Sequence, residues 1–114
     1  MRAIATEAEL ERALAGFIER IKQGIRVESI VLYGSYATGK ADGWSDLDVA
    51  VVSPDFEALP MSRRQEILAG LAVGTDPRIA PIGYASTELR GPMLPALLRE
   101  IVRTGKVIYR APAE

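Results

Sequence analysis

The amino-acid sequence predicts an α/β (α+β) fold in which helices flank a small mixed β-sheet. Three observations lead to this class: apolar residues recur at helical spacing in three segments, β-branched runs of strand length lie between and after them, and no internal repeat or linker divides the 114 residues. The predicted order is helix, strand, strand, helix, strand, helix, strand. We therefore expect a single domain, residues 1–114, with its helices packed on the sheet.

The chain begins with one predicted helix and one predicted strand. Residues 6–22 are amphipathic, and Thr6 followed by Glu9 has the pattern of a capping box. Residues 27–33 are β-branched and partly alternating, which indicates a strand that ends at Gly34. The loop after this glycine is compatible with a short helical turn.

The middle of the chain is predicted to form a buried strand and a second helix. Residues 47–52 are apolar apart from Asp48, so we expect this strand to be buried on both faces beyond that residue. Residues 62–73 have a helical pattern with Ser62 as the N-cap, and a Gly-Thr-Asp-Pro turn ends the helix.

The last part of the chain is predicted to form a strand, a helix and a final strand. Residues 78–84 have strand character, but Pro81 lacks an N–H group and argues for an edge position or a bulge. Residues 94–104 form an amphipathic pattern that Gly105 closes. Residues 106–109 are long enough for one short strand.

The composition limits the kinds of chemistry that are available. Fourteen Lys and Arg residues against 15 Asp and Glu residues give a net charge of -1, which disfavours direct, sequence-independent binding of nucleic acid. Cysteine and histidine are absent, so chemistry must use carboxylates, hydroxyls, Lys, Arg and backbone groups. No apolar run approaches the length of a membrane span, and we expect a cytoplasmic protein without membrane contact.

Two acidic residues interrupt an otherwise apolar stretch. On a strand Asp46 and Asp48 point the same way, with Cα atoms about 6.5 Å apart. Two parallel carboxylates repel each other, and a Mg²⁺ ion between them would remove that cost. The alternative is structural, with Asp46 capping the loop and Asp48 paired with a Lys or Arg.

A Gly-Ser pair ends the strand that precedes these acids. Gly34 lets a backbone approach a ligand closely, and Ser35, at the expected start of a helical turn, offers a hydroxyl and N–H groups to phosphate oxygens. A Gly-Ser pair alone is more often a simple turn.

Taken together, the strand, the Gly34-Ser35 pair, a ten-residue spacer and the Asp46-Leu47-Asp48 strand resemble the signature of the DNA polymerase beta-like nucleotidyltransferase superfamily. The chain looks most like the minimal nucleotidyltransferases, or MNT proteins. Small residues at Ala37 and Gly39, and residues 97–109, are similar to the family's loop and to its closing helix and strand. The resemblance covers nearly the whole chain and implies a palm-like nucleotidyltransferase fold.

The resemblance also implies a site and a reaction. In the family, the residues that correspond to Gly34 and Ser35 hold the nucleoside triphosphate, here ATP, and those that correspond to Asp46 and Asp48 bind Mg²⁺ and are catalytic. Two-metal nucleotidyl transfer is the implied chemistry.

The chain departs from the family pattern at the third carboxylate. The family usually places this acid on the next core strand, and the corresponding position here is Ala80, which can neither bind metal nor accept a proton. Asp76 is a weaker substitute because it precedes Pro77 and is better suited to capping the turn. Three interpretations stay open: a weak or inactive member, a natural binding-only form, or a chain whose catalytic acid has been replaced for study.

Stand-alone MNT proteins of this size resemble the antitoxin half of HEPN/MNT toxin–antitoxin pairs. The resemblance therefore implies a hetero-oligomer in which the chain transfers AMP from ATP to a tyrosine of a HEPN ribonuclease toxin and neutralises it. The alternative is a non-catalytic module that binds the toxin or a nucleotide, and Ala80 favours it.

Five further side chains have two interpretations each. Tyr36 either stacks on the nucleotide or packs on the sheet, and packing is favoured. Lys40, Arg63 and Arg64 either reach phosphates or are solvated, and solvation is favoured. Trp44, just before the acids, is either a lid over the nucleotide or a partner contact.

Overall fold

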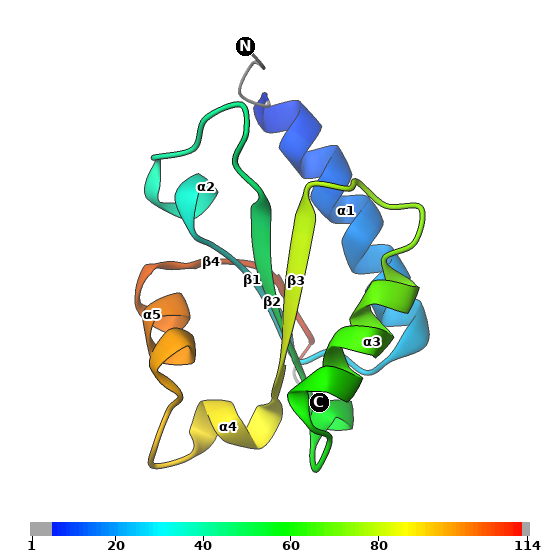
Figure 1. Ribbon diagram of the computed structural model, residues 1–114, viewed down its shortest axis with the longest axis vertical. Helices are drawn as coiled ribbons and strands as arrows, with labels where there is room; N and C mark the ends of the chain where they lie inside the picture. The colour runs from blue at the N-terminus through cyan, green and yellow to red at the C-terminus, as the bar shows by residue number, and fades with distance from the viewer. Residues whose placement is uncertain (1–5, 113–114) are drawn as a thin grey trace.

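A four-stranded mixed sheet forms the centre of the computed structural model, which describes residues 6–112 (Figure 1). The strands are β1 (Ser29–Tyr33), β2 (Leu47–Ser53), β3 (Ile79–Ala85) and β4 (Lys106–Arg110). Their order across the sheet is β3-β2-β1-β4. Strand β1 is antiparallel to β2 and β4, whereas β2 and β3 are parallel. The predicted fold class is confirmed.

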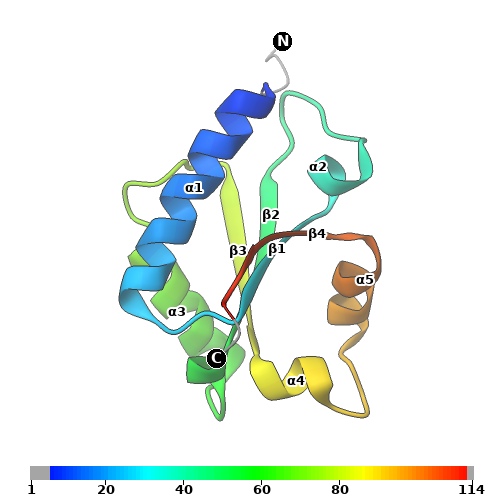
Figure 2. The same ribbon diagram turned by 180° about the vertical axis from the view of Figure 1, so that it is seen from behind.

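Helices cover both faces of this sheet. They are α1 (Glu7–Gly24), α2 (Ser35–Thr38), η1 (Pro54–Phe56, a 3-10 turn), α3 (Met61–Leu71), α4 (Ser86–Arg90) and α5 (Ala96–Thr104). Helices α1 and α3 lie on one face, and α4 and α5 lie on the other (Figures 1 and 2). None of the helices in the described part of the chain is long and apolar enough to cross a membrane.

Two of these helices were not predicted, and two begin elsewhere than expected. Elements α4 and η1 are too short to show a periodic pattern. Helix α3 is capped by Pro60 rather than by Ser62, since the Pro60 carbonyl accepts hydrogen bonds from the N–H groups of Arg63 and Arg64. Helix α5 likewise begins after Pro95, whose fixed φ suits a helix start.

The capping box at the start of α1 is confirmed. The Thr6 hydroxyl accepts a hydrogen bond from the Glu9 N–H at 3.2 Å, and the Glu9 carboxylate accepts one from the Thr6 N–H at 3.1 Å. These bonds satisfy donors that a helix start leaves without partners.

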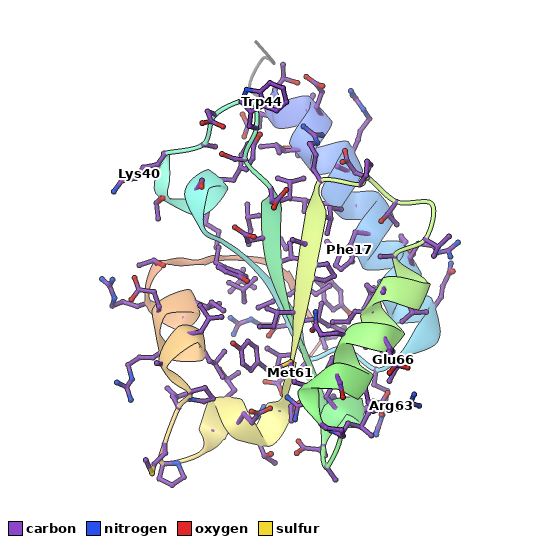
Figure 3. The ribbon with its side chains drawn as sticks, in the orientation of Figure 1. Phe17, Lys40, Trp44, Met61, Arg63 and Glu66 are labelled. Carbon is purple, nitrogen blue, oxygen red and sulfur yellow. The ribbon has the colours of Figure 1, made fainter. Side chains whose placement is uncertain are left out.

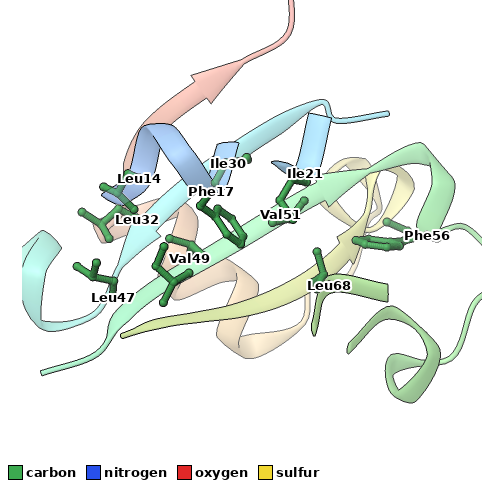
Figure 4. Close-up of a cluster of buried hydrophobic side chains, with 12 residues drawn as sticks. Leu14, Phe17, Ile21, Ile30, Leu32, Leu47, Val49, Val51, Phe56 and Leu68 are labelled. Carbon is green, nitrogen blue, oxygen red and sulfur yellow. The ribbon is translucent and has the colours of Figure 1, made fainter. Parts of the chain in front are cut away.

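The core has two parts because β1 and β2 are buried on both faces. Alternate residues of these strands pack with α1 and α3 in a first cluster (Figure 4). The first cluster includes Leu14, Phe17, Ile21, Ile30, Leu32, Leu47, Val49, Val51, Phe56 and Leu68. The residues between them pack with α5 in a second cluster, which is Val31, Ala50, Val52, Tyr84, Leu98 and Ile101. The expected double burial of β2 is confirmed.

Strand β3 lies at an edge of the sheet, as Pro81 predicted. Its outer side is occupied by a side chain of α3: the Gln65 amide donates to the Pro81 carbonyl at 2.8 Å and accepts from the Gly83 N–H at 3.2 Å. The glutamine therefore takes the place that a neighbouring strand would otherwise fill.

Candidate active site

The centre of the candidate site is a close contact between Gly34 and Asp48. Asp48 is the second residue of β2 and lies opposite Tyr33, the last residue of β1. Gly34 follows at once with φ 76° and ψ -150°, a conformation that only glycine adopts readily. A Cβ atom on Gly34 would lie 3.2 Å from the Asp48 Cγ and still closer to a carboxyl oxygen, so no side chain fits there.

The loop after Gly34 is a compact helical turn. The Gly34 carbonyl accepts hydrogen bonds from the N–H groups of Ala37 and Thr38, each at 3.1 Å. Gly39 ends the turn in the left-handed conformation. Within residues 6–112 the Ser35 hydroxyl has no hydrogen-bond partner, and the N–H groups of Ser35 and Tyr36, at the start of the turn, have no acceptor inside it. The loop can therefore offer donors to an anion.

Asp46 lies just before β2 and is exposed, whereas Asp48 is half-buried. Burial raises the pKa of Asp48, and the neighbouring charge of Asp46 raises it further. No ion pair joins either carboxylate to a Lys or Arg in the described residues, so the structural alternative for Asp48 has no partner there. The arrangement costs free energy unless a cation is bound.

These two carboxylates fit a Mg²⁺ ion that also binds a phosphate. Mg²⁺ is usually held by one or two carboxylates together with substrate phosphate oxygens. The described residues contain no cluster of three or more possible protein ligands, so a metal here would depend on the nucleotide for its remaining ligands.

The position expected for a third acid is next to Asp48. Ala80 of β3 is its register partner in the parallel pair, so the two side chains leave the sheet on the same face. Asp76, the weaker substitute, instead accepts hydrogen bonds from the backbone and guanidinium of Arg78 at 2.7–3.0 Å. It caps the turn before β3, as expected.

One residue beside the acids was not singled out from the sequence. The phenol of Tyr33 has its pKa raised to about 12 by burial first, then by the charges of Asp48 and Tyr84. It is therefore an uncharged hydroxyl at neutral pH. Its position at the end of the strand that leads to Gly34 is the signal that could have identified it.

The structure places the other polar and aromatic candidate residues in different parts of the molecule. Tyr36 packs against the first core cluster, so packing was the correct interpretation. Trp44 is 67% exposed at the end of the loop before the acids, and Lys40 is exposed on the same loop (Figure 3). Arg63 is exposed and pairs with Glu66 on α3, far from that loop (Figure 3).

Arg64 is neither solvated nor available for phosphate. Its side chain is buried, donates to the carbonyls of Leu59 and Gly83, and pairs with Glu88 at 2.5 Å. Both interpretations from the sequence were wrong for this residue, because a charged residue in a helical pattern gives no sign of a buried partner on a distant element.

Known proteins share this fold. The model of one protein family, described as a nucleotidyltransferase domain, matches residues 12–91. Curated proteins include none that matches the chain. A crystal structure from Sulfolobus solfataricus, assigned as a nucleotidyltransferase, superposes with a TM-score of 0.68 at 14% identity and covers 88% of this chain and 79% of its own. At this identity the likeness shows the fold alone.

Two solved toxin–antitoxin structures are also similar. One contains AMP-PNP and matches with a TM-score of 0.61 at 25% identity, covering 89% of this chain and 73% of that chain. The other is a variant of the MntA–HpeT pair, with a TM-score of 0.60 at 25% identity over 86% of this chain and 72% of that chain.

Proposed function

The chain belongs to the nucleotidyltransferase domain family, and from this premise we propose that it is an antitoxin that transfers AMP from ATP to a tyrosine of a HEPN ribonuclease toxin. The observation that carries the proposal is the Gly34 backbone held against the Asp48 carboxylate, with Asp46 beside it. The toxin–antitoxin relatives, one of them with the ATP analogue AMP-PNP, support the partner and the nucleotide.

In the proposed reaction the residues of the chain chiefly position the substrates. Gly34 and Ser35 hold the triphosphate, and Asp46 and Asp48 hold the metal. Bound Mg²⁺ supplies charge neutralisation at the phosphates. The acceptor oxygen forms a bond to the α-phosphorus while the bond to pyrophosphate breaks, and the acceptor proton passes to water because Ala80 cannot take it. We expect slow turnover for this reason.

The test is transfer of label to the toxin. The protein is incubated with α-labelled ATP, Mg²⁺ and its cognate HEPN partner, and label on the toxin is followed over time. We expect slow labelling that requires Mg²⁺ and is lost in the Asp46→Asn/Asp48→Asn double variant. The control is Glu66→Gln, an exposed carboxylate on α3 that should leave labelling unchanged. Equal labelling in the double variant would contradict the proposed metal site.

A second function, favoured by Ala80, is binding without transfer. In that case the protein would hold the toxin or a nucleotide and inhibit by occupancy. If the protein inhibits the toxin completely while no AMP is incorporated into the toxin at any time, binding without transfer replaces the enzymatic proposal.

A further inference from the structure

The two edges of the sheet differ in how they are protected. On β3, Pro81 has no N–H to offer and Gln65 bonds the next outward groups, so a further strand cannot pair there. On β4, no side chain or segment among residues 6–112 hydrogen bonds to the outer backbone of residues 106–110. Helix α1 packs on one face of β4, at Ile108 and Tyr109, and leaves this outer edge open. The sheet thus has one closed edge and one open edge.

A cavity of about 200 Å³ lies under the open edge. Val31, Ala50 and Val52 of the sheet form its floor, and Leu98 and Ile101 of α5 form one wall. An apolar cavity of about 150 Å³ is large enough for benzene, so this one can hold a leucine or phenylalanine side chain. The second core cluster leaves this space unfilled.

The rim of the cavity is apolar and positively charged. Val102 and Val107 line it and are 53% and 49% exposed. Arg110 also lines it, whereas Lys106, at the other end of β4, is the register partner of Leu32 and lies on the opposite face of the sheet. In the described part of the chain neither cation has an ion-pair partner. The open edge therefore combines backbone groups, an apolar cavity and two cations, one on each face, that have no ion-pair partner among residues 6–112.

We propose that the β4 edge and its cavity bind an extended segment of a partner protein by strand addition, with one apolar side chain in the cavity and acidic side chains near Lys106 and Arg110. Main-chain hydrogen bonds would supply affinity, and the cavity and cations would supply specificity. A second copy of the chain fits less well, because antiparallel pairing of two β4 strands around Ile108 places Lys106 opposite Arg110. The inference does not depend on the transfer reaction.

The first experiment uses a pair of synthetic peptides and the isotopically labelled protein. The acidic probe is Ser-Glu-Val-Leu-Val-Glu-Ser, and the matched probe has Lys in place of Glu. We expect the acidic probe to bind about fivefold more tightly, since an exposed ion pair with Arg110 on the cavity face replaces a repulsion. Its binding should slow amide exchange in residues 106–110. Equal binding of both probes, no binding of the acidic one, or protection confined to other strands would overturn the proposal.

Two sets of variants test the cations and the cavity separately. Lys106→Glu/Arg110→Glu, at exposed positions, should reverse the preference between the probes. Val102→Trp should close the rim of the cavity and weaken binding of the acidic probe about tenfold. Leu97→Trp should leave that binding unchanged, because Leu97 is also exposed on α5 but does not line the cavity. Unchanged preference or unchanged affinity in these variants would count against strand addition here.

Two other occupants would be recognised by different results. Concentration-dependent dimerisation that protects the β4 amides would replace the partner segment with a second copy. Displacement of the acidic probe by octanoate, with no protection of β4, would replace it with a small apolar carboxylate. None of these measurements uses ATP or the toxin, so their failure would leave the proposed transfer reaction unaffected.

Discussion

At the scale of single residues, two glycines show how the same backbone angle serves different purposes. Gly34 and Gly39 have φ values of 76° and 77°. A Cβ on Gly39 would meet nothing within 4 Å, whereas one on Gly34 would meet the Asp48 carboxyl group. Gly39 is needed for the turn alone, and Gly34 for the turn and for the approach to Asp48.

Replacement of each glycine by alanine should separate these effects. Gly39→Ala should lower the free energy of unfolding by about 1 kcal/mol and leave nucleotide binding intact. Gly34→Ala should lower the free energy of unfolding by about 2–4 kcal/mol, because backbone strain and a clash with Asp48 both destabilise the folded state. It should also abolish binding of ATP with Mg²⁺. Denaturant unfolding and calorimetric titration measure both. Normal ATP binding by a folded Gly34→Ala protein would rule out the phosphate role of this turn.

The raised pKa of Asp48 predicts a pH dependence with a definite sign. Because the folded state disfavours the charged carboxylate, wild-type protein should lose stability relative to Asp48→Asn as pH rises from about 3.9 through the raised pKa. Above that window the variant should remain the more stable. Unfolding curves measured across this pH range, with and without Mg²⁺, test it, and Mg²⁺ should reduce the difference.

Asp55 provides a control for which the pH dependence of stability should have the opposite sign. Hydrogen bonds from the Arg26 backbone and guanidinium lower the pKa of this carboxyl. Asp55→Asn should therefore be less stable than wild type at neutral pH, and the difference should vanish as pH falls through the lowered pKa. The same sign for both variants would contradict the electrostatic explanation.

At the scale of elements, α3 connects to β3 through buried polar groups. Arg64 satisfies two carbonyls and pairs with Glu88, which also accepts from the N–H of Ala85. This one side chain links α3 to the end of β3 and to α4. The edge of the sheet is thus held by polar contacts as well as by the apolar core.

Two neighbouring arginines test this link. Arg64→Ala should lower the free energy of unfolding by about 2–4 kcal/mol, because buried carbonyls and Glu88 lose their partner. Arg63→Ala should change it by no more than about 0.5 kcal/mol, since its pair with Glu66 is exposed. Denaturant unfolding of both variants provides the comparison. Equal losses of unfolding free energy in the two variants would show that the buried contacts of Arg64 contribute nothing to stability.

The register of β2 and β3 predicts how a third acid would act. Because Ala80 is the partner of Asp48, Ala80→Asp should place a carboxylate beside the other two and raise Mg²⁺-dependent labelling of the toxin about 100-fold, as a positioned base does. Ala80→Asn is the matched neutral control. Should both variants stay at the wild-type rate, position 80 is not the site of the absent acid.

At the scale of the whole molecule, the two core clusters share their central strands. Successive residues of β1 and β2 point alternately into one cluster and the other, so neither cluster can lose its packing without disturbing the same backbone. The molecule should therefore unfold in one cooperative transition.

A substitution in the smaller cluster tests this cooperativity. Leu98→Ala should lower the free energy of unfolding by about 2–5 kcal/mol, and far-UV and near-UV circular dichroism should still report one midpoint. Far-UV signal reports the helices and strands together, and near-UV signal reports the packing of the aromatic side chains, among them the buried Tyr84 of the second cluster. Leu97→Ala, at an exposed position on the same helix, should change stability by no more than about 0.5 kcal/mol. Two separate midpoints would indicate clusters that unfold independently.

Features that depend on nearby residues could be predicted from the sequence. The capping box at Thr6, the double burial of β2 and the edge position of the strand with Pro81 are all confirmed. Each of these features follows from the local pattern of apolar and polar residues or from the stereochemistry of one residue. The Gly34-Ser35 pair, the ten-residue spacer and the Asp46-Leu47-Asp48 strand are local in the same way, and together they led to the correct family before any strand was paired.

Only the tertiary structure decided which distant residues meet. It placed the Gly34 backbone against Asp48, made Ala80 the partner of that carboxylate, and buried Arg64 beside Glu88. It also left β4 open above an apolar cavity. These contacts depend on strand register and on a parallel crossover between β2 and β3. Such long-range pairings are selected by the summed packing of the whole chain, which no local pattern records.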